Sequence, residues 1–191
     1  KTHKFLINRV YSKKENTIKN LANLCIKTNN KYKIASVIKH IPGHGLANSD
    51  SHKKLPVINK NLHFLLKNDF KIFKNINSSF AMTAHILFKK IDSKNCVTHS
   101  NKIINDIIRK KLKYKGILIS DDISMKSLKY DVLENAIRAL NAGCNLALYC
   151  NGNLKDNIKL LKKIPIIDEF TKKKTAVFYK LISYCLLWSR I

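Results

Sequence analysis

Short apolar runs alternate along this chain with longer segments in which apolar residues recur every three or four positions. A continuous run such as residues 34–38 is typical of a buried strand, and the wider spacing is typical of a helix. The strand candidates are residues 5–7, 34–38, 80–85, 117–120 and 145–149, with a weaker sixth near Val177. Helices are predicted at residues 14–27, 62–73, 103–112 and 132–141 and after Asn153.

The predicted helix at 132–141 has a signal at each end. Asp131 is a favourable N-cap residue, and Gly143 follows where the chain would leave the helix. Strands separated by single helices predict a parallel sheet with right-handed crossovers. No repeat, low-complexity linker or domain boundary interrupts the pattern, so we expect one domain.

Polar residues lie just beyond several of the apolar runs, namely Arg9, Lys39, His40, His85 and Asp121. The carboxyl ends of the strands of a (β/α)8 barrel form one mouth, where such residues gather. We therefore expect these side chains along one edge of the sheet. Met82 and His85 fit the core or a pocket wall better than a catalytic role.

The loop at residues 39–56 is the most unusual stretch of the chain. It contains two of the five glycines, two of the three prolines and three of the seven histidines. Glycine and proline fix special backbone conformations, and loops on rigid strands often carry functional side chains. This loop is therefore predicted to place side chains at the sheet edge.

Two motifs resemble those of the bacterial β-N-acetylhexosaminidases of glycoside hydrolase family 3. The first comprises Lys39, His40, Pro42, Gly43, His44 and Gly45, followed by Asp50, Ser51, His52, Leu55 and Pro56. The second comprises Ile107, Ile108, Arg109 and Lys111, then residues 116–121 and Ser124. They lie about seventy residues apart and in the family's order.

The resemblance implies a retaining glycosidase without a cofactor. Its nucleophile would be Asp121, and its acid/base would be His52 paired with Asp50, since histidine exchanges protons near neutral pH. Alternation along the strand separates Asp121 from Asp122 but does not choose between them, because both faces begin apolar. For Asp122 we favour a helix cap or a structural hydrogen bond.

The resemblance also implies a sugar-binding role for Lys39 and His40, and a weaker match assigns Arg9 to the same task. His44 is interpreted as a residue that braces the loop. Zinc bound by His40, His44 and His52 is the alternative, but the chain has no H-E-x-x-H motif and no cysteine partner, so we expect no metal.

The family has a barrel catalytic domain, whereas a barrel needs eight strands and typically about 250 residues. We therefore predict that residues 1–191 form a single, truncated domain, the C-terminal portion of a (β/α)8 barrel with parallel strands, and that it is inactive alone. Open sheet edges in a partial barrel favour association, so low solubility or oligomers are expected.

The net charge of +25 invites comparison with nucleic-acid-binding proteins. Only four of the 37 basic residues are arginine, and no Arg-rich block is present, so we interpret the charge as compositional and expect no nucleic-acid partner. No run of eighteen apolar residues predicts membrane insertion. The five scattered cysteines suit reduced thiols in the cytoplasm.

The expected function is that of a cytoplasmic exo-β-N-acetylglucosaminidase that removes terminal N-acetylglucosamine from muropeptides during peptidoglycan recycling. The substrate follows from the resemblance alone. Two alternatives remain open. One is another family 3 β-glycosidase, such as a β-glucosidase, and the other is an inactive barrel remnant or a basic binding protein.

Overall fold

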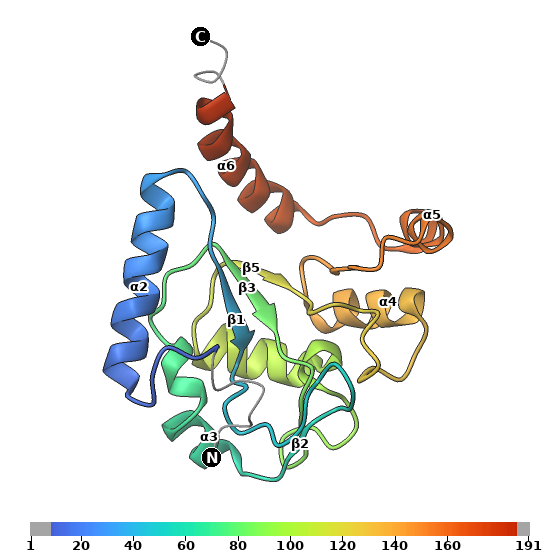
Figure 1. Cartoon of the computed structure of the whole chain (residues 1–191). Helices are drawn as coiled ribbons and strands as arrows, with labels where there is room; N and C mark the ends of the chain where they lie inside the picture. Colours follow the sequence, from blue (N-terminus) through green and yellow to red (C-terminus); the bar gives the residue numbers. More distant parts are fainter. Residues whose placement is uncertain (1–8, 187–191) are drawn as a thin grey trace.

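A three-stranded parallel sheet forms the centre of the molecule, whose computed structural model describes residues 9–186. Its order is β1–β3–β5, with β1 at Val37–Ile41, β3 at Phe80–Thr83 and β5 at Ile117–Ile119. Ala81 lies opposite both Ile38 and Leu118, so the three strands are in one register at their centre. Figure 1 shows their arrowheads pointing the same way.

Helices connect the strands. Helix α2 (Glu15–Lys31) precedes β1, α3 (Leu62–Lys67) and the 3-10 helix η1 (Phe70–Phe73) precede β3, and the 3-10 helix η2 (Val97–His99) and the π-helix η3 (Ile103–Lys111) precede β5. After β5 come α4 (Val132–Ala142), α5 (Leu154–Lys163) and α6 (Glu169–Leu186). Two short strands, β2 (Val57–Ile58) and β4 (Leu87–Phe88), pair in parallel elsewhere. The predicted alternation of helices and parallel strands is confirmed.

Some boundaries differ from the predictions. Residues 145–149 form no full strand, because their pairing with β5 is one parallel bridge between Ile119 and Leu146. Val177 lies inside α6, so the sixth strand predicted there is wrong; its local apolar pattern belongs to a helix. The candidate at residues 5–7 lies outside the described residues. Across the described part of the chain the sheet is open, and a complete barrel is not formed.

The core fixes the strands from one side. The isoleucines of η3 that recur at helical spacing are Ile103, Ile104, Ile107 and Ile108, and all are at most 1% exposed. They pack in one apolar cluster with Leu118 of β5 and Ile41 of β1. Burial of such side chains contributes about 1.5–3 kcal/mol each. The carboxyl ends of β1 and β5 therefore rest on a well-packed support.

Helix α4 confirms both predicted end signals. The Asp131 side chain accepts a hydrogen bond from the backbone N–H of Glu134 at 2.8 Å. Gly143 has a φ of 113°, a left-handed conformation that glycine adopts without strain. These local bonds define the ends of α4 independently of the sheet.

Candidate active site

The polar ends of β1 and β5 meet at one edge of the sheet. The ring atom Nε2 of His40 lies 3.6 Å from Oδ2 of Asp121, and each of the two side chains is only 15% exposed. His40 lies near the end of β1 and Asp121 lies two residues after β5, and the two strands flank β3 in the same direction. His40 and Asp121, two of the residues expected along one edge of the sheet, are thus in contact.

Asp121 is oriented by its own backbone. Its Oδ1 atom accepts a hydrogen bond from the backbone N–H of Asp122 at 2.9 Å, while Oδ2 is the atom that faces His40. The two oxygens therefore have different surroundings. One is anchored by a main-chain donor, and the other is directed toward the neighbouring strand end.

The residues on either side of Asp121 make structural contacts instead. Asp122 Oδ1 accepts hydrogen bonds from the backbone N–H groups of Ser124 at 3.0 Å and Cys150 at 3.2 Å. The Ser120 hydroxyl oxygen accepts one from the N–H of Leu148 at 2.9 Å. These bonds connect the end of β5 to the segment after Leu146. Asp122 thus makes the structural hydrogen bonds expected of it.

His40 is neutral at pH 7. Burial lowers its pKa to about 4; His44, Lys39 and Arg9 act in the same direction, and the charge of Asp121 opposes them. Both Lys39 and Arg9 are therefore close enough to act on the site electrostatically. A neutral imidazole has one donor and one acceptor nitrogen, which suits it to bind a hydroxyl group.

The first half of the loop after β1 is braced internally. His44 is 8% exposed, and its Nε2 atom lies 3.4 Å from the hydroxyl oxygen of Ser51. Its carbonyl oxygen accepts the N–H of Ala47 at 3.1 Å, and its ring centre lies 5.2 Å from that of His40. His44 thus connects the two ends of the loop, as its bracing role predicted.

The second half of the loop, which carries Asp50 and His52, is more open. Asp50 Oδ1 accepts the backbone N–H of His52 at 3.0 Å, and the Asp50 carbonyl oxygen accepts the N–H groups of Lys53 and Lys54. The carboxylate therefore contacts the main chain of His52, whose side chain is exposed. His52 is close enough to His85 to contribute to lowering the pKa of that buried residue.

Asp69 supports the loop from behind and was missed in the sequence. A Cβ atom added to Gly43 would lie 2.3 Å from Asp69 Oδ2, and one added to Gly45 would lie 3.0 Å from Oδ1. Burial raises the pKa of Asp69 to about 6, although the N–H of Gly45 hydrogen-bonds to it and acts in the opposite direction. The spacing of the two glycines hinted at a close approach, but nothing in the sequence identified the partner.

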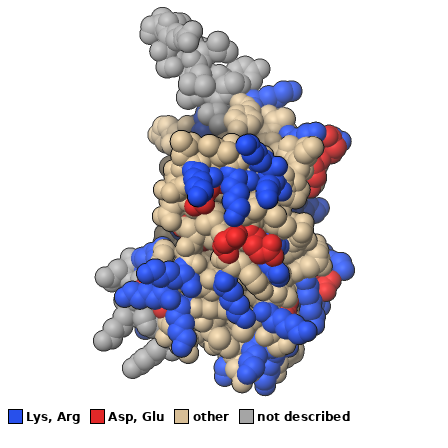
Figure 2. All heavy atoms as spheres, turned by 90° about the vertical axis from the view of Figure 1, so that its right-hand side faces the viewer, with Lys and Arg blue, Asp and Glu red and all other residues tan. Residues whose placement is uncertain are grey.

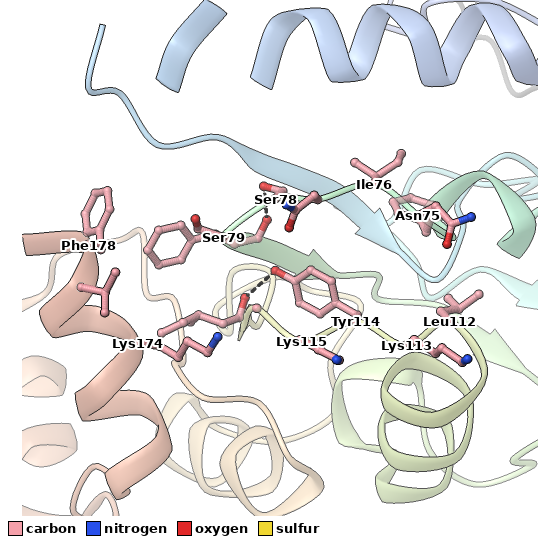
Figure 3. Close-up of a pocket in the computed structure, with 16 residues that line it drawn as sticks. Asn75, Ile76, Ser78, Ser79, Leu112, Lys113, Tyr114, Lys115, Lys174 and Phe178 are labelled. Atoms are coloured by element: carbon pink, nitrogen blue, oxygen red, sulfur yellow. Dashed lines mark hydrogen bonds between the residues drawn. The ribbon is translucent and has the colours of Figure 1, made fainter. Parts of the chain in front are cut away.

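The opposite ends of the strands carry a separate hollow of about 380 Å³ (Figure 3). Its lining includes Ser78 and Ser79 before β3 and Tyr114 before β5. The Ser78 hydroxyl donates to the carbonyl oxygen of Phe80, and the Tyr114 hydroxyl donates to that of Ile117. Because these polar groups bond to the main chain, the hollow has a structural lining, and the candidate site lies at the other end of the sheet.

Metal binding, membrane insertion and surface charge are further features by which a site could be recognised. Among residues 9–186, no group of three or more His, Cys, Asp or Glu side chains is arranged to hold a metal ion. In that same range, none of the helices has the length and apolar character needed to cross a membrane. Figure 2 shows basic side chains scattered over the visible face among uncharged and some acidic side chains, rather than gathered in one stripe.

Comparison with known proteins identifies the family. The model of the glycosyl hydrolase family 3 N terminal domain matches residues 4–174. The β-hexosaminidase of Haemophilus influenzae (strain Rd) is 32% identical over 168 residues, which are 82% of this chain and 48% of that protein. That of Psychromonas ingrahamii is 32% identical over 178 residues, which are 90% and 50%. The chain belongs to glycoside hydrolase family 3.

Solved structures agree with this assignment. A family 3 β-N-acetylglucosaminidase from Paenibacillus sp. has a TM-score of 0.81 and 25% identity, over 95% of this chain and 37% of that one. NagZ from Neisseria gonorrhoeae in complex with N-trifluoroacetyl-D-glucosamine has a TM-score of 0.79 and 26% identity, over 93% and 52%. The chain spans half or less of the curated relatives it matches, from 35% to 50% of their length.

Proposed function

We propose that this chain carries the catalytic groups of a retaining exo-β-N-acetylglucosaminidase. The observation that supports this most is the placement of Asp121. Its carboxylate is anchored at one oxygen, while the other faces His40 of the first family motif at 3.6 Å. A nucleophilic carboxylate beside sugar-binding groups is what a retaining glycosidase requires.

The reaction takes place in two steps. Asp121 Oδ2 attacks the anomeric carbon, the glycosidic bond breaks, and the His52 imidazolium gives its proton to the departing oxygen. His52 then takes a proton from water, the hydroxyl oxygen attacks the anomeric carbon, and the bond to Asp121 breaks. The configuration is retained because the carbon is inverted twice. Asp50 stabilises the charged form of His52, as carboxylates do in other dyads.

The loop must rearrange for Asp50 and His52 to act as a catalytic pair. Asp50 contacts the main chain of His52 in the substrate-free geometry, and the His52 ring is exposed. Catalytic contacts often tighten only around bound substrate, and loop closure commonly completes a site. We place the closing movement in the exposed residues 52–54, because His44 and Asp69 already hold the first half of the loop and His44 also holds the buried Ser51.

Lys39, His40 and Arg9 would bind the sugar hydroxyl groups. The neutral state of His40 favours this, since a charged imidazole would pair with Asp121 and compete with the attacking oxygen. The natural substrate we propose is terminal N-acetylglucosamine on peptidoglycan-derived muropeptides, in cytoplasmic cell-wall recycling. The names of the relatives support N-acetylglucosamine as the sugar that is removed. The muropeptide substrate and the cytoplasmic location are further parts of the proposal. Residues 1–191 would be part of one barrel domain.

Hydrolysis of chromogenic glycosides tests the proposal. Both the 191-residue chain and the full-length product of its gene are assayed with a β-N-acetylglucosaminide and with the matching β-glucoside. We expect turnover of the N-acetylglucosaminide by the full-length product and none by the chain alone. Preference for the glucoside supports a different family 3 glycosidase. No turnover, together with salt-dependent binding to DNA, supports a basic binding protein.

Covalent trapping tests the nucleophile separately. A slow fluorinated N-acetylglucosaminide leaves a glycosyl group on the attacking carboxylate, which peptide mass spectrometry locates. We expect the adduct on Asp121. An adduct on Asp122, or on no residue of this chain, overturns the assignment.

A further inference from the structure

A buried chain of hydrogen bonds runs from β3 to the residue after Asp121. The hydroxyl oxygens of Thr83 and Thr98 lie 2.9 Å apart, and Thr98 Oγ1 lies 2.7 Å from Nδ1 of His85. The other ring nitrogen of His85, Nε2, lies 3.0 Å from the carbonyl oxygen of Asp122. Thr83, His85 and Thr98 are all 0% exposed, so bulk solvent does not reach these groups.

Only one arrangement of protons satisfies this chain. The carbonyl oxygen of Asp122 can only accept, so Nε2 of His85 must carry the hydrogen. Burial lowers the pKa of His85 and keeps the ring neutral, so Nδ1 has no hydrogen and must accept from Thr98. The single hydroxyl hydrogen of Thr98 is then used, and Thr98 accepts from Thr83. The position of each hydrogen in the series thus determines the position of the next one.

The series of hydrogen bonds ends at Asp122, the residue whose N–H orients the Asp121 carboxylate. The N–H of Asp122 donates to Asp121 Oδ1, and the Asp122 side chain accepts from Ser124 and from the N–H of Cys150. The carbonyl group of Asp122 accepts two hydrogen bonds, one from the N–H of Met125 at 3.2 Å within the same turn and one from Nε2 of His85, which follows β3. Only the bond from His85 connects this carbonyl group to another part of the sheet. Because the N–H and C=O groups are joined through one Cα atom, fixing the carbonyl limits rotation of the N–H.

We propose that His85 is a positioning residue, which holds the carbonyl group of Asp122 and through it the donor that aims the Asp121 carboxylate. The inference rests on the proposed function, since it takes Asp121 as the nucleophile. His85 itself has no path to the substrate, because it is completely buried. Its contribution is to fix the attacking oxygen before the sugar arrives, which preserves near-attack geometry.

Activity of the full-length gene product tests the proposal with a set of matched variants. His85→Leu removes both hydrogen bonds, and we expect kcat to fall about 100-fold with little change in KM, as for a misplaced reacting group. His85→Gln keeps a donor for the Asp122 carbonyl group and should recover most of the loss. Thr98→Val removes the donor to Nδ1 and the acceptor of Thr83 but leaves the bond from His85 to the Asp122 carbonyl group, so it should cause a smaller fall in kcat. Ser78→Ala, which removes a hydroxyl that lies within hydrogen-bond distance of the Ser36 and Phe80 carbonyl oxygens at the opposite strand end, should lower stability but not kcat.

Nuclear magnetic resonance on the 191-residue chain provides a readout that does not depend on turnover. Nitrogen-15 spectra of labelled histidine should show His85 with its hydrogen on Nε2. The amide signal of Asp122 and the carboxyl signal of Asp121 should move in His85→Leu and stay in place in Ser78→Ala. A hydrogen on Nδ1, or unmoved signals, overturns the positioning role.

The two proposals fail in different ways. Absence of turnover in the unsubstituted full-length product contradicts the proposed function, and the spectra alone then decide on His85. Normal kcat in a folded His85→Leu variant, beside an inactive Asp121→Asn variant, contradicts the positioning role and leaves the nucleophile in place.

Discussion

The two strand ends that meet at the candidate site are held in different ways. At the end of β5, Ser120, Asp121 and Asp122 all accept hydrogen bonds from main-chain N–H groups, and His85 holds the carbonyl group that follows. In the second half of the loop after β1, the bonds of Asp50 go to backbone N–H groups within residues 52–54, none of them to the sheet, and the His52 side chain is exposed. Hydrogen bonds from neighbouring segments hold the β5 end in place, whereas the segment that carries His52 is free to change its conformation.

This difference matches the two chemical tasks. An attacking carboxylate gains from a position fixed in advance, since preorganised geometry removes an entropic barrier. An acid/base residue must reach over a sugar that enters from outside, so part of its loop has to move. The number of hydrogen bonds to neighbouring elements thus distinguishes Asp121, which is fixed before substrate binds, from His52, whose loop must move.

Asp121→Asn in the full-length product should give the largest effect. Removing the nucleophilic oxygen should lower turnover by on the order of 10³-fold or more, because the remaining groups cannot form the covalent intermediate. Circular dichroism should show an unchanged fold. Asp122→Ala is the matched control and should mainly reduce stability, by about 0.5–1.5 kcal/mol, since the N–H groups of Ser124 and Cys150 lose their acceptor. If Asp122→Ala were as inactive as Asp121→Asn at equal stability, the distinction between the two carboxylates would be lost.

Asp50→Asn should lower turnover by about 10²–10⁴-fold, the usual contribution of general acid–base catalysis. Its effect on stability should be small, because an amide oxygen can still accept the His52 N–H. The comparison with Asp122→Ala then separates the two strand ends, since activity is lost in one case and stability in the other. Kinetics and urea denaturation of both variants measure this, and unchanged turnover in Asp50→Asn would end the dyad proposal.

Local sequence signals predicted the parts of the fold that local forces determine. Asp131 and Gly143 marked the ends of α4 because the capping bonds connect residues three or four positions apart. The apolar runs located the buried strands β3 and β5, because burial on both faces needs continuous apolar sequence. The run at residues 34–38 located β1 (Val37–Ile41) less well, and β1 is not buried throughout, since Val37 is 42% exposed. Residues 145–149 looked equally strand-like, yet they form a single bridge, since pairing depends on what lies beside them.

The site could be predicted only as far as its motifs reach. Asp121 and His40 were expected at one sheet edge, and they are in contact. The contact between Asp69 and Gly43 joins residues 26 positions apart, and no spacing rule specifies it. His85 was expected in the core, where it lies, but its hydrogen bond to Asp122 depends on the packing of two neighbouring strands.

Gly43→Ala tests the fixed first half of the loop. Its new methyl group would lie 2.3 Å from Asp69 Oδ2, so the loop or the carboxyl group must shift. Forcing extra volume into a packed site costs about 1–3 kcal/mol, and chemical denaturation should show this loss. In Gly43→Ala with Asp69→Ala the clash is gone, and the double variant should be more stable than the two single losses predict. Strict additivity would show that the two residues do not contact each other in solution.

The smallest effect we expect concerns the response to acid. The pKa of His40 is about 4 when folded and near 6.5 when unfolded, so the unfolded chain binds the proton first and stability falls as pH decreases through this range. Asp69 acts with the opposite sign, because its folded pKa of about 6 exceeds the unfolded value of 3.8, and its contribution grows as pH decreases through that window.

Two variants separate these contributions at the β1 end. Between pH 7 and 5.5, His40→Gln should reduce the loss of unfolding free energy by about 1 kcal/mol, since one buried histidine no longer has to take up a proton. Asp69→Asn should increase that loss, because the opposing group is removed. Urea denaturation at the two pH values measures both slopes. Parallel curves for the two variants and the unsubstituted chain would mean that neither group changes its proton affinity on folding, and the acid response would then have to come from histidines elsewhere, such as His85 beneath the β5 end.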